Sequence, residues 1–584
     1  MAMQPTSELF VSPESDLKEV LTVQARATQF GLPAGIALVV DDQQKLLGTI
    51  SDGDIRRNLI EHHSLNLKAR QLMNTEPITF PEGMSFRHLL ETLPNELANR
   101  GRRSTKFLSK IIFVNKEGSP TRVLDYHQLW EQRVATHRHI VVVGLGYVGL
   151  TLALVLADVG YLVTGVDVDV ERVMALEAGR SYVHEVGLPE LLREHLGKNF
   201  RVSTELPDDG DVFVISVGTP VVPVNPGENP QPSLNALASS AEAIGAKLKV
   251  GNLVVLRSTV PIGTSREYMV ERLEKISGLQ CGSDFHLAFA PERTAEGKAI
   301  QELRSLPQII GGFNEDSMES TAALFREMTP TIVRVGSLEA AEMAKLINNS
   351  FRDLIFGYAN YVSQIAEAYN LDIHEVIRAA NQGYVRDPVP LPSPGVGGPC
   401  LTKDPYIFAH VAKKHLPDYT LFEAGRQANE AMHTSVQRRV LEQLKATGKD
   451  PQDCKVLVCG LAFKGHPETG DIRNSTSLDI LELLRPQVGS ILGYDPVATP
   501  AELAEFGIVP AGELPEGFQG MDAVLFLNNH RDFTKLDVFA MVRSMNPNPV
   551  IFDGWNLFHE QDILKAAPAI YLGLSHKISS VKSH

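Results

Sequence analysis

Cys400 is the residue whose surroundings most clearly suggest chemistry. It lies in the segment PSPGVGGPCLTKDPY, where glycines and prolines flank the thiol and Asp404 follows four residues later. Backbone amides in such a Gly-rich turn can lower the pKa of a thiol and later stabilise an oxyanion. The alternative is a buried, inert thiol in a loop, but this setting is not that of a cysteine packed on an apolar face. We therefore expect Cys400 to be a nucleophile.

The other three cysteines, Cys281, Cys454 and Cys459, are better interpreted as inert packing thiols. Cys459 lies in KVLVCGLAF, an apolar segment typical of a core strand. No two cysteines form a CxxC pair, and four in 584 residues do not make a disulfide framework. These features favour a reducing compartment.

A second chemical signal is the glycine pattern of Gly144, Gly146 and Gly149. This G-x-G-x-x-G follows a β-rich run and opens a helical pattern, the context that a dinucleotide site requires. Asp167 stands about 20 residues further on, where a carboxylate binds the ribose 2′-hydroxyl and repels a 2′-phosphate. We expect NAD rather than NADP. Arg172 leaves NADP open, because it could meet a 2′-phosphate, and a structural turn without cofactor is the other alternative.

The elements that must position these residues form several domains. Strand-like and helical segments alternate over residues 137–335, which predicts an NAD-binding domain with a parallel, doubly wound sheet. A long helical pattern without proline opens a central helical domain, residues 336–445. A second α/β pattern over residues 446–584 predicts a C-terminal Rossmann-like domain.

Residues 1–136 read as a separate α/β segment with two related units. LGTISDGDIRR and MNTEPITFPEG resemble a CBS-domain pair, a regulatory module that often binds adenine nucleotides. The resemblance implies that Ser51 and Asp54 meet a ribose. A dimerisation module without ligand is the alternative.

Composition limits the remaining possibilities. The formal net charge of −15 argues against nucleic acid or an anionic membrane as partner. The N-terminus lacks the pattern of a signal peptide, and no run of about 18 apolar residues suggests a membrane span. We expect a cytoplasmic protein without a metal site.

Six motifs in order carry a resemblance to a known family. GLGYVGL, STVPIGT, PER, AAEMAKLINN, GVGGPCLTKD and GLAFKGHPETGDIRNS extend over roughly residues 138 to 575. This resembles the UDP-glucose/GDP-mannose dehydrogenase family. The resemblance implies two Rossmann-like domains around a central helix that builds a homodimer or higher homo-oligomer, and a nucleotide sugar bound in the C-terminal domain.

The resemblance also implies roles for individual residues. The catalytic group comprises Cys400 as nucleophile with Lys345, Asn349, Glu292, Asp404 and Thr259. The cofactor group comprises Gly144, Gly146, Tyr147, Val148, Gly149, Asp167, Arg172, Thr219 and Thr259. The substrate group comprises Glu292, Arg293, Lys345, Asn349, Arg386, Gly397, Lys464 and Arg473. Without the ordered motifs, Lys345 would be an exposed helix lysine, and Lys464 and Arg473 solvated turn charges.

The implied reaction is a four-electron oxidation. A sugar C6 alcohol loses hydride to NAD, Cys400 adds to the aldehyde, a second hydride transfer leaves a thioester, and water hydrolyses it. PERTAEGKA and the Cys400 loop are closer to the branch acting on UDP-N-acetylhexosamines, such as UDP-N-acetylmannosamine, in surface-polysaccharide precursor synthesis. In the family this loop often continues with Pro-Lys-Asp, whereas here it continues with Thr402-Lys403-Asp404. A UDP-glucose or GDP-mannose enzyme and a catalytically silent nucleotide-sugar sensor are the alternatives.

Overall fold

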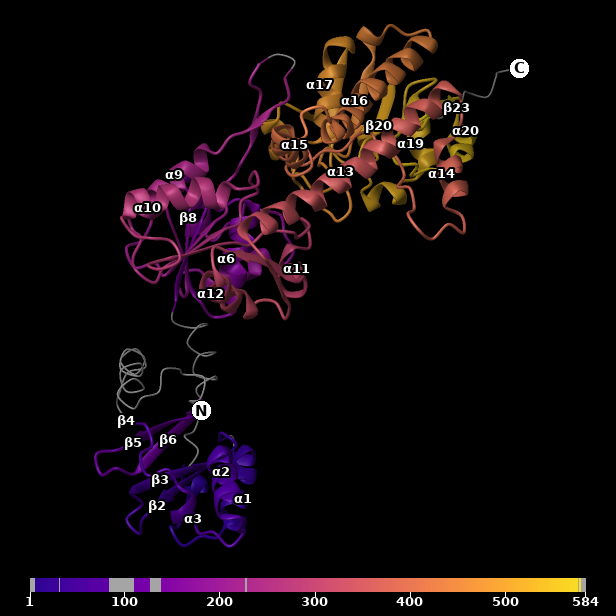
Figure 1. Cartoon of the computed structure of the whole chain (residues 1–584). Helices are drawn as coiled ribbons and strands as arrows, with labels where there is room; N and C mark the ends of the chain where they lie inside the picture. The colour runs from indigo at the N-terminus through magenta and orange to yellow at the C-terminus, as the bar shows by residue number, and fades with distance from the viewer. Residues whose placement is uncertain are drawn as a thin grey trace. The chain divides into compact units, whose positions relative to one another are not determined.

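The computed structural model describes residues 6–30, 32–82, 110–125, 138–225, 228–575 and 577–578. The chain divides into two compact units, Met1–Thr136 and His137–His584. Each unit has its own sheets and its own helices (Figure 1).

The N-terminal unit contains two three-stranded sheets of the same topology. In each, a parallel pair is followed by an antiparallel hairpin, and the hairpin has a register shift at the end of its first strand. The strands are β1 (Phe10–Val11), β2 (Ile36–Val40) and β3 (Leu46–Ser51) in one sheet, and β4 (Thr79–Pro81), β5 (Lys110–Val114) and β6 (Pro120–Asp125) in the other. The helices are α1 (Leu17–Arg26), α2 (Asp52–His62) and α3 (Ala69–Leu72).

The two hairpins of this unit turn in the same way and touch. Asp41 and Asn115 stand at equivalent positions, and each side chain accepts hydrogen bonds from two backbone amides of its own turn. Leu46 N donates to Gly118 O at 3.1 Å, which joins the hairpins. The prediction of two related units agrees with this repetition. The segments MSFRHLLETL and YHQLWEQR have sequence patterns that predict helices, and both lie outside the described residues.

The second unit opens with an eight-stranded sheet in the order β16-β15-β14-β13-β10-β7-β8-β9. Its strands are β7 (His139–Val143), β8 (Leu162–Val166), β9 (Phe200–Ser203), β10 (Val212–Ile215), β13 (Leu253–Leu256), β14 (His286–Phe289), β15 (Gln308–Gly312) and β16 (Ile332–Val335). β7, β10 and β13 are buried at every residue, as expected for strands covered by helices on both faces.

The predicted parallel sheet has one antiparallel pair, near one edge. β15 pairs antiparallel with β14, and β16 runs parallel to β15. The segment between β14 and β15 contains one short helix, α11 (Ala299–Ser305), whose seven residues rise only about 10 Å. β15 runs back along β14, so the chain reverses direction at this edge of the sheet.

Helices and a small hairpin complete this domain. The helices are α6 (Tyr147–Asp158), α7 (Val170–Glu177), α8 (Leu188–His195), α9 (Asn235–Gly245), the π-helix η4 (Thr264–Val270), α10 (Glu271–Ser277) and α12 (Glu315–Arg326). The hairpin is β11 (Val221–Val222) with β12 (Gln231–Pro232).

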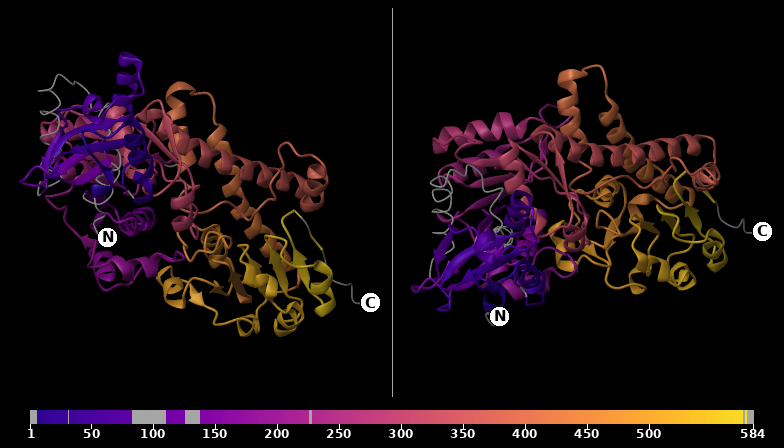
Figure 2. Two further views of the ribbon diagram at one scale, coloured as in Figure 1. Left: turned by 90° about the horizontal axis from the view of Figure 1, so that it is seen from below. Right: turned by 60° about the horizontal axis from the view of Figure 1, so that its bottom comes forward.

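Four helices form the central part. α13 (Leu338–Ala368) starts at Ser337, whose hydroxyl caps the helix by accepting from Ala340 N. Figures 1 and 2 show α13 as a rod that links the domain of the eight-stranded sheet to the C-terminal part. The others are α14 (Ile373–Asn381), α15 (Asp404–His415) and α16 (Leu421–Ala446).

The C-terminal part is a seven-stranded sheet in the order β19-β18-β17-β20-β21-β22-β23. Its strands are β17 (Lys455–Cys459), β18 (Ser490–Tyr494), β19 (Val509–Pro510), β20 (Ala523–Phe526), β21 (Val550–Asp553), β22 (Ile570–Leu572) and β23 (Lys577–Ile578). Its α-helices are α17 (Thr476–Leu484), α18 (Pro500–Glu505), α19 (Val538–Ser544) and α20 (Glu560–Ala566). Only β23 is antiparallel.

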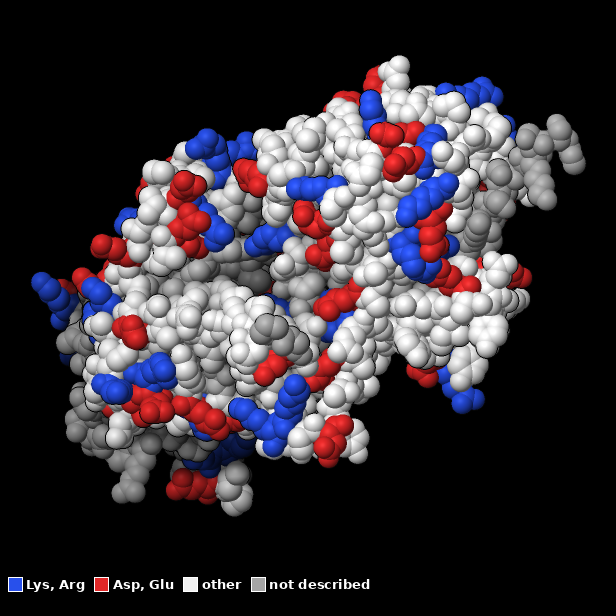
Figure 3. Space-filling model, turned by 90° about the horizontal axis from the view of Figure 1, so that it is seen from above, with Lys and Arg blue, Asp and Glu red and all other residues white. Residues whose placement is uncertain are grey.

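Among the described residues, no helix is both long and apolar enough to span a bilayer. Figure 3 shows acidic and basic side chains interspersed over one face of the molecule.

Candidate active site

The glycine-rich turn has the geometry of a dinucleotide site. Gly144 has φ of +89°, a value that favours glycine, and its N–H donates to Val166 O at 2.8 Å. A Cβ on Gly149 would lie 1.8 Å from Gly144 O, so helix α6 reaches the turn only with glycine there. The free amides at the start of α6 suit a pyrophosphate.

Asp167, at the end of β8, is predicted to bind the ribose 2′-hydroxyl, and it also stabilises the glycine-rich turn. Its carboxylate accepts hydrogen bonds from Leu145 N at 2.7 Å and Asp169 N at 3.0 Å, so it also holds the glycine turn. Arg172 lies 3.1 Å from Asp169 and 3.7 Å from Asp167. The guanidinium is thus already neutralised by carboxylates, which makes it a poor receptor for a 2′-phosphate.

The C-terminal domain repeats this arrangement. Gly460 has φ of +86° and donates to Tyr494 O at 2.8 Å, as Gly144 does to Val166 O. Asp495, just after β18, accepts from Leu461 N at 2.8 Å and Ala462 N at 2.9 Å. Both Rossmann-like domains therefore carry the same turn, held by the same kind of carboxylate.

Helix α13 brings two predicted catalytic residues to one place. Lys345 is buried, so the alternative of an exposed helix lysine is wrong, and its Nζ donates to Glu292 O at 2.5 Å. One turn further, Asn349 donates to Asp404 Oδ2 at 2.5 Å. Residues four apart share a helix face, which is why one helix reaches both partners.

The loop that carries Cys400 packs tightly against the C-terminal domain. Gly398 N donates to Asn474 O at 2.8 Å, and a Cβ on Gly398 would lie 2.6 Å from the ring of Phe463. A Cβ on Gly397 would lie 2.6 Å from Asn474 O. The carbonyl of Cys400 then accepts from the first amide of α15, Asp404 N, at 2.9 Å. Glycine is therefore required at positions 397 and 398, because the C-terminal domain leaves no space there for a Cβ atom.

Cys400 differs from the other cysteines in exposure and in charged neighbours. Cys281, Cys454 and Cys459 are buried, whereas Cys400 is accessible. The pKa of its thiol is nevertheless raised, first because surrounding protein desolvates it and then because of Asp404, while Lys345 and Lys403 oppose the shift. The resting thiol is neutral, and the two lysines are the groups that favour the thiolate.

Glu292 is held by an arginine that the sequence analysis did not identify. Arg257 Nη2 contacts Glu292 Oε2 at 2.5 Å, and both residues are buried. Burial raises the pKa of Glu292, but Arg257 and the amide of Thr294 outweigh burial, so its pKa is lowered. Nothing local in the sequence indicates this partner, which lies 35 residues away. Thr259, two residues after Arg257, accepts at its carbonyl from Thr219 Oγ1 at 2.5 Å.

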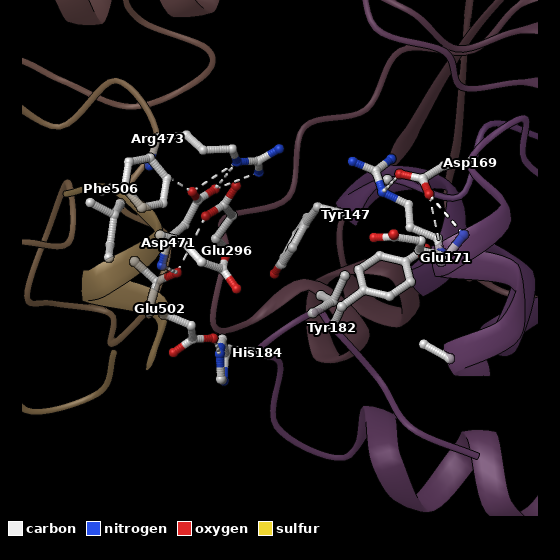
Figure 4. Close-up of a pocket in the computed structure, with 18 residues that line it drawn as sticks. Tyr147, Asp169, Glu171, Tyr182, His184, Glu296, Asp471, Arg473, Glu502 and Phe506 are labelled. Carbon is white, nitrogen blue, oxygen red and sulfur yellow. Dashed lines mark hydrogen bonds and ion pairs between the residues drawn. The ribbon is translucent and has the colours of Figure 1, made fainter. Parts of the chain in front are cut away.

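A cavity of about 470 Å³ lies between the NAD-binding and C-terminal domains. Figure 4 shows Glu296 and Asp471 beside Arg473 on one side of the cavity. Asp169, Glu171 and Tyr182 lie on the other side. Desolvation and then Asp471 raise the pKa of Glu296 to about 7. Lys464 donates to Glu296 O at 2.8 Å, and Arg473 donates to Asp471 at 2.9 Å. Lys464 therefore bonds to the backbone of the Glu296 segment, whereas Arg473 is exposed at the cavity and pairs within its own turn.

Glu296 should make the stability of the ligand-free protein depend on pH. Its pKa rises from 4.5 to about 7 on folding, so ionisation above pH 4.5 weakens the folded state, by ~3 kcal/mol once pH exceeds 7. We expect Glu296→Gln to unfold at a higher temperature than the parent at pH 8 and at nearly the same temperature at pH 4.5. Thermal unfolding at both pH values measures this, with the exposed Glu205→Gln as control. An equal offset at both pH values would contradict it.

Not every predicted residue joins the cluster. Arg293 donates to the carbonyl of Pro307, and Arg386 is exposed, over the ring of Tyr384. Tyr147 donates to Glu185, which also accepts from Gly297 N at 2.7 Å. Glu185, which no motif indicated, therefore joins the glycine turn to the Glu296 segment. Lys403 was also missed, although it stands beside Asp404 in the Cys400 motif.

In the N-terminal unit, Ser51 and Asp54 contact each other. They form a capping box at the start of α2, and Ser51 Oγ donates to Asp54 Oδ2 at 2.6 Å. Arg57 pairs with the other oxygen at 2.5 Å. A ribose would have to share these groups with the helix cap.

Comparison with known protein families gives four matches. Residues 138–329, 339–431 and 457–560 match the NAD binding, central and UDP binding domains of the UDP-glucose/GDP-mannose dehydrogenase family. Residues 3–61 match a CBS domain.

Individual relatives agree with these matches. A UDP-N-acetyl-D-mannosamine dehydrogenase of Pyrococcus horikoshii is 32% identical over 73% of this chain and 97% of its own. An NDP-N-acetyl-D-galactosaminuronic acid dehydrogenase of Ralstonia nicotianae is 33% identical over 68% of this chain and 92% of its own. The solved structure of the Pyrococcus horikoshii UDP-D-ManNAc dehydrogenase has a TM-score of 0.66 at 30% identity, covering 75% of this chain and 99% of that one.

Proposed function

We propose a function from one premise: the chain belongs to the UDP-glucose/GDP-mannose dehydrogenase family and is an NAD-dependent nucleotide-sugar dehydrogenase. The proposal is a four-electron oxidation of a sugar C6 alcohol to the acid through a thioester on Cys400. The observation that carries it is the accessible thiol of Cys400 among Lys345, Lys403 and Asp404.

NAD, when bound, accepts one hydride in each of the two oxidations. In the first, C6 becomes an aldehyde and the hydroxyl proton leaves. Cys400 then adds as thiolate to the aldehyde carbon, and Lys345 with Asn349 stabilises the oxyanion of the thiohemiacetal. Loss of the second hydride leaves a thioester. Water, oriented by Glu292, Thr259 and Asp404, displaces the thiolate and releases the acid.

The substrate that we propose is a UDP-N-acetylhexosamine, such as UDP-N-acetylmannosamine, in surface-polysaccharide precursor synthesis. The relatives named above are a UDP-N-acetyl-D-mannosamine dehydrogenase and an NDP-N-acetyl-D-galactosaminuronic acid dehydrogenase, each about one third identical to this chain. UDP-glucose and GDP-mannose remain the alternatives, because one sequence does not identify the residues that meet C2.

A panel of UDP- and GDP-sugars with NAD tests the proposal. We expect two NADH per sugar acid, because the aldehyde stays on Cys400 until the second oxidation. We expect the highest kcat/KM for a UDP-N-acetylhexosamine. The measurements are NADH absorbance and mass spectrometry of the sugar product. One NADH per sugar with free aldehyde would contradict the thioester, and binding without NADH formation would favour the silent sensor.

A homodimer through α13 is part of the proposal. One face of α13 and its end exposes large apolar residues, mostly three or four positions apart: Met343, Ile347, Phe351, Tyr358, Tyr361, Ile365 and Tyr369. Exposed apolar patches of this kind mark interaction surfaces. A second copy is the partner that the family's architecture suggests.

The N-terminal unit is proposed to regulate the enzyme by binding an adenine nucleotide. We expect the chain truncated to residues 137–584 to turn over and to dimerise like the full chain, because the three family domains and α13 lie within it. ATP, ADP or AMP should change the activity of the full chain only. Light scattering and kinetics measure both. A folded truncated chain without turnover would contradict the modular interpretation.

A further inference from the structure

A buried polar network lies between α13 and α16, beneath the loop that carries Cys400. α13 contributes Asp353 and Asn360, and α16 contributes Arg426 and Asn429. All four are at most 1% exposed. Four polar side chains at the centre of a helix pair need a reason, because an apolar contact of similar volume is often as stable or more so.

The two helices approach closely enough for these side chains to bond directly. A Cβ on Gly357 of α13 would lie 2.7 Å from the carbonyl oxygen of Gly425 of α16. Arg426 Nη1 donates to Asp353 Oδ1 at 2.8 Å, and Asn429 Nδ2 donates to the same oxygen at 2.8 Å. Burial lowers the pKa of Arg426, but Asp353 and Glu430 outweigh burial and its pKa is raised. The guanidinium therefore stays charged.

The network holds the chain on the amino-terminal side of Cys400. Arg426 Nη1 also donates to Val396 O, four residues before Cys400, at 3.1 Å. Asn360 Oδ1 accepts from Ser393 N at 2.8 Å, and Ser393 Oγ donates to Gly395 O at 2.7 Å. The beginning of the loop is thus bonded to both helices.

The same arginine reaches the carboxyl-terminal side of Cys400. Arg426 Nη2 donates to Glu430 Oε1 at 3.2 Å, and the hydroxyl of Tyr406 donates to that oxygen at 3.1 Å. Tyr406 lies in the first turn of α15, two residues after Asp404. One guanidinium therefore connects both flanks of the nucleophile loop, through two different nitrogens.

We propose that Arg426 is a positioning residue that fixes the loop carrying Cys400 from both sides. This rests on the proposed role of Cys400 as nucleophile. A guanidinium suits the task because its planar fork carries donors on separate nitrogens in fixed directions, whereas an ammonium group carries all its donors on one nitrogen. Arg426 does not touch the reacting atoms. It acts by keeping the thiol in register with Lys345, Lys403 and Asp404.

The test separates positioning from simple stability. Arg426→Met alone leaves Asp353 buried and unpaired, which destabilises the fold strongly. The double variant Asp353→Leu/Arg426→Met removes both charges and should unfold near the parent temperature. It lacks the bonds to Val396 and Glu430. A purely structural role predicts that the double variant recovers activity, whereas a positioning role predicts that it does not.

We expect the double variant to bind NAD like the parent but to have a kcat at least tenfold lower, with a smaller change in KM. Iodoacetamide should alkylate its Cys400 faster, because a released loop is better solvated. Intact-protein mass spectrometry follows this reaction at one site, since the other three cysteines are buried. Arg438→Met is the matched control: it removes an ion-pairing arginine of α16 that is half exposed.

A double variant whose kcat and alkylation rate stay within twofold of the parent overturns the proposal. If it fails to fold, Arg426→Lys carries the same test, because it keeps the charge beside Asp353 and loses the fork. Lower kcat with faster alkylation supports positioning, and parent values for both overturn it. The alkylation rate does not depend on turnover. A parent inactive on every nucleotide sugar would therefore count against the proposed function and leave the loop measurement intact.

Discussion

Replacing Cys400 by serine is expected to lower steady-state NADH production from a nucleotide sugar by on the order of 10³-fold or more. A serine hydroxyl is not appreciably ionised near neutral pH, and Lys345 and Lys403 do not lower its pKa enough to change this. The first hydride transfer needs no covalent bond, so some reversible aldehyde formation can survive. Binding of NAD and of the nucleotide sugar should persist, because Cys400 holds neither.

The measurement is NADH production beside mass spectrometry of the intact protein. A slowly hydrolysed oxygen ester on the serine would be trapped, since a thioester is hydrolysed more readily than an ester. Cys454→Ser is the matched control: Cys454 is buried, and its Sγ donates to Asp450 O at 3.4 Å, a bond that serine can keep. Turnover of Cys400→Ser near the parent rate would remove the main support for the four-electron reaction.

Replacing Lys345 by methionine should be nearly as damaging, with a loss of roughly 10²- to 10³-fold in kcat. Methionine fills the same buried space but donates nothing to Glu292 O and offers no charge to an oxyanion at C6. Lys345 also opposes the raised pKa of Cys400. Its removal should raise that pKa further, so alkylation of Cys400 at fixed pH should become slower.

Two readouts therefore change together in Lys345→Met: kcat falls, and the pH dependence of alkylation moves to higher pH. Lys445→Met, an exposed lysine in the last turn of α16, controls for the loss of one positive charge. If alkylation of Cys400 is unaffected while kcat falls, Lys345 acts on the oxyanion alone. An unchanged kcat would exclude Lys345 from the chemistry.

Local patterns predicted much of this molecule. The glycines of the first turn, the long helix α13 and the family to which the chain belongs are all confirmed, as are NAD and the nucleotide-sugar dehydrogenase activity. These features depend on residues close together in sequence, or on several motifs in a fixed order. Even the burial of Cys459 follows from its apolar neighbours.

What the sequence did not reveal depends on distant partners. Arg257 holds Glu292, and Arg426 holds the Cys400 loop through Val396; neither arginine stands out in its own segment. The reversed direction of β15 is not visible in the alternation of strands and helices, because the segment before β15 looks like an ordinary crossover. The second task of Asp167 appears only when the backbone amide of Leu145 is placed beside it.

The paired carboxylates at the cleft bear on how the enzyme lets go of its product. In the proposed reaction, the substrate enters with a neutral C6 alcohol, and the product leaves as an anion at the same carbon. The charge of Glu296 adds to the raised pKa of the Cys400 thiol, and the charge of Asp471 adds to the raised pKa of Glu296. Above pH 7, where Glu296 is ionised, the two carboxylates of Glu296 and Asp471 repel a newly formed carboxylate. In the proposed reaction, hydrolysis thus converts a neutral group into an anion that these carboxylates repel, which favours weak product inhibition.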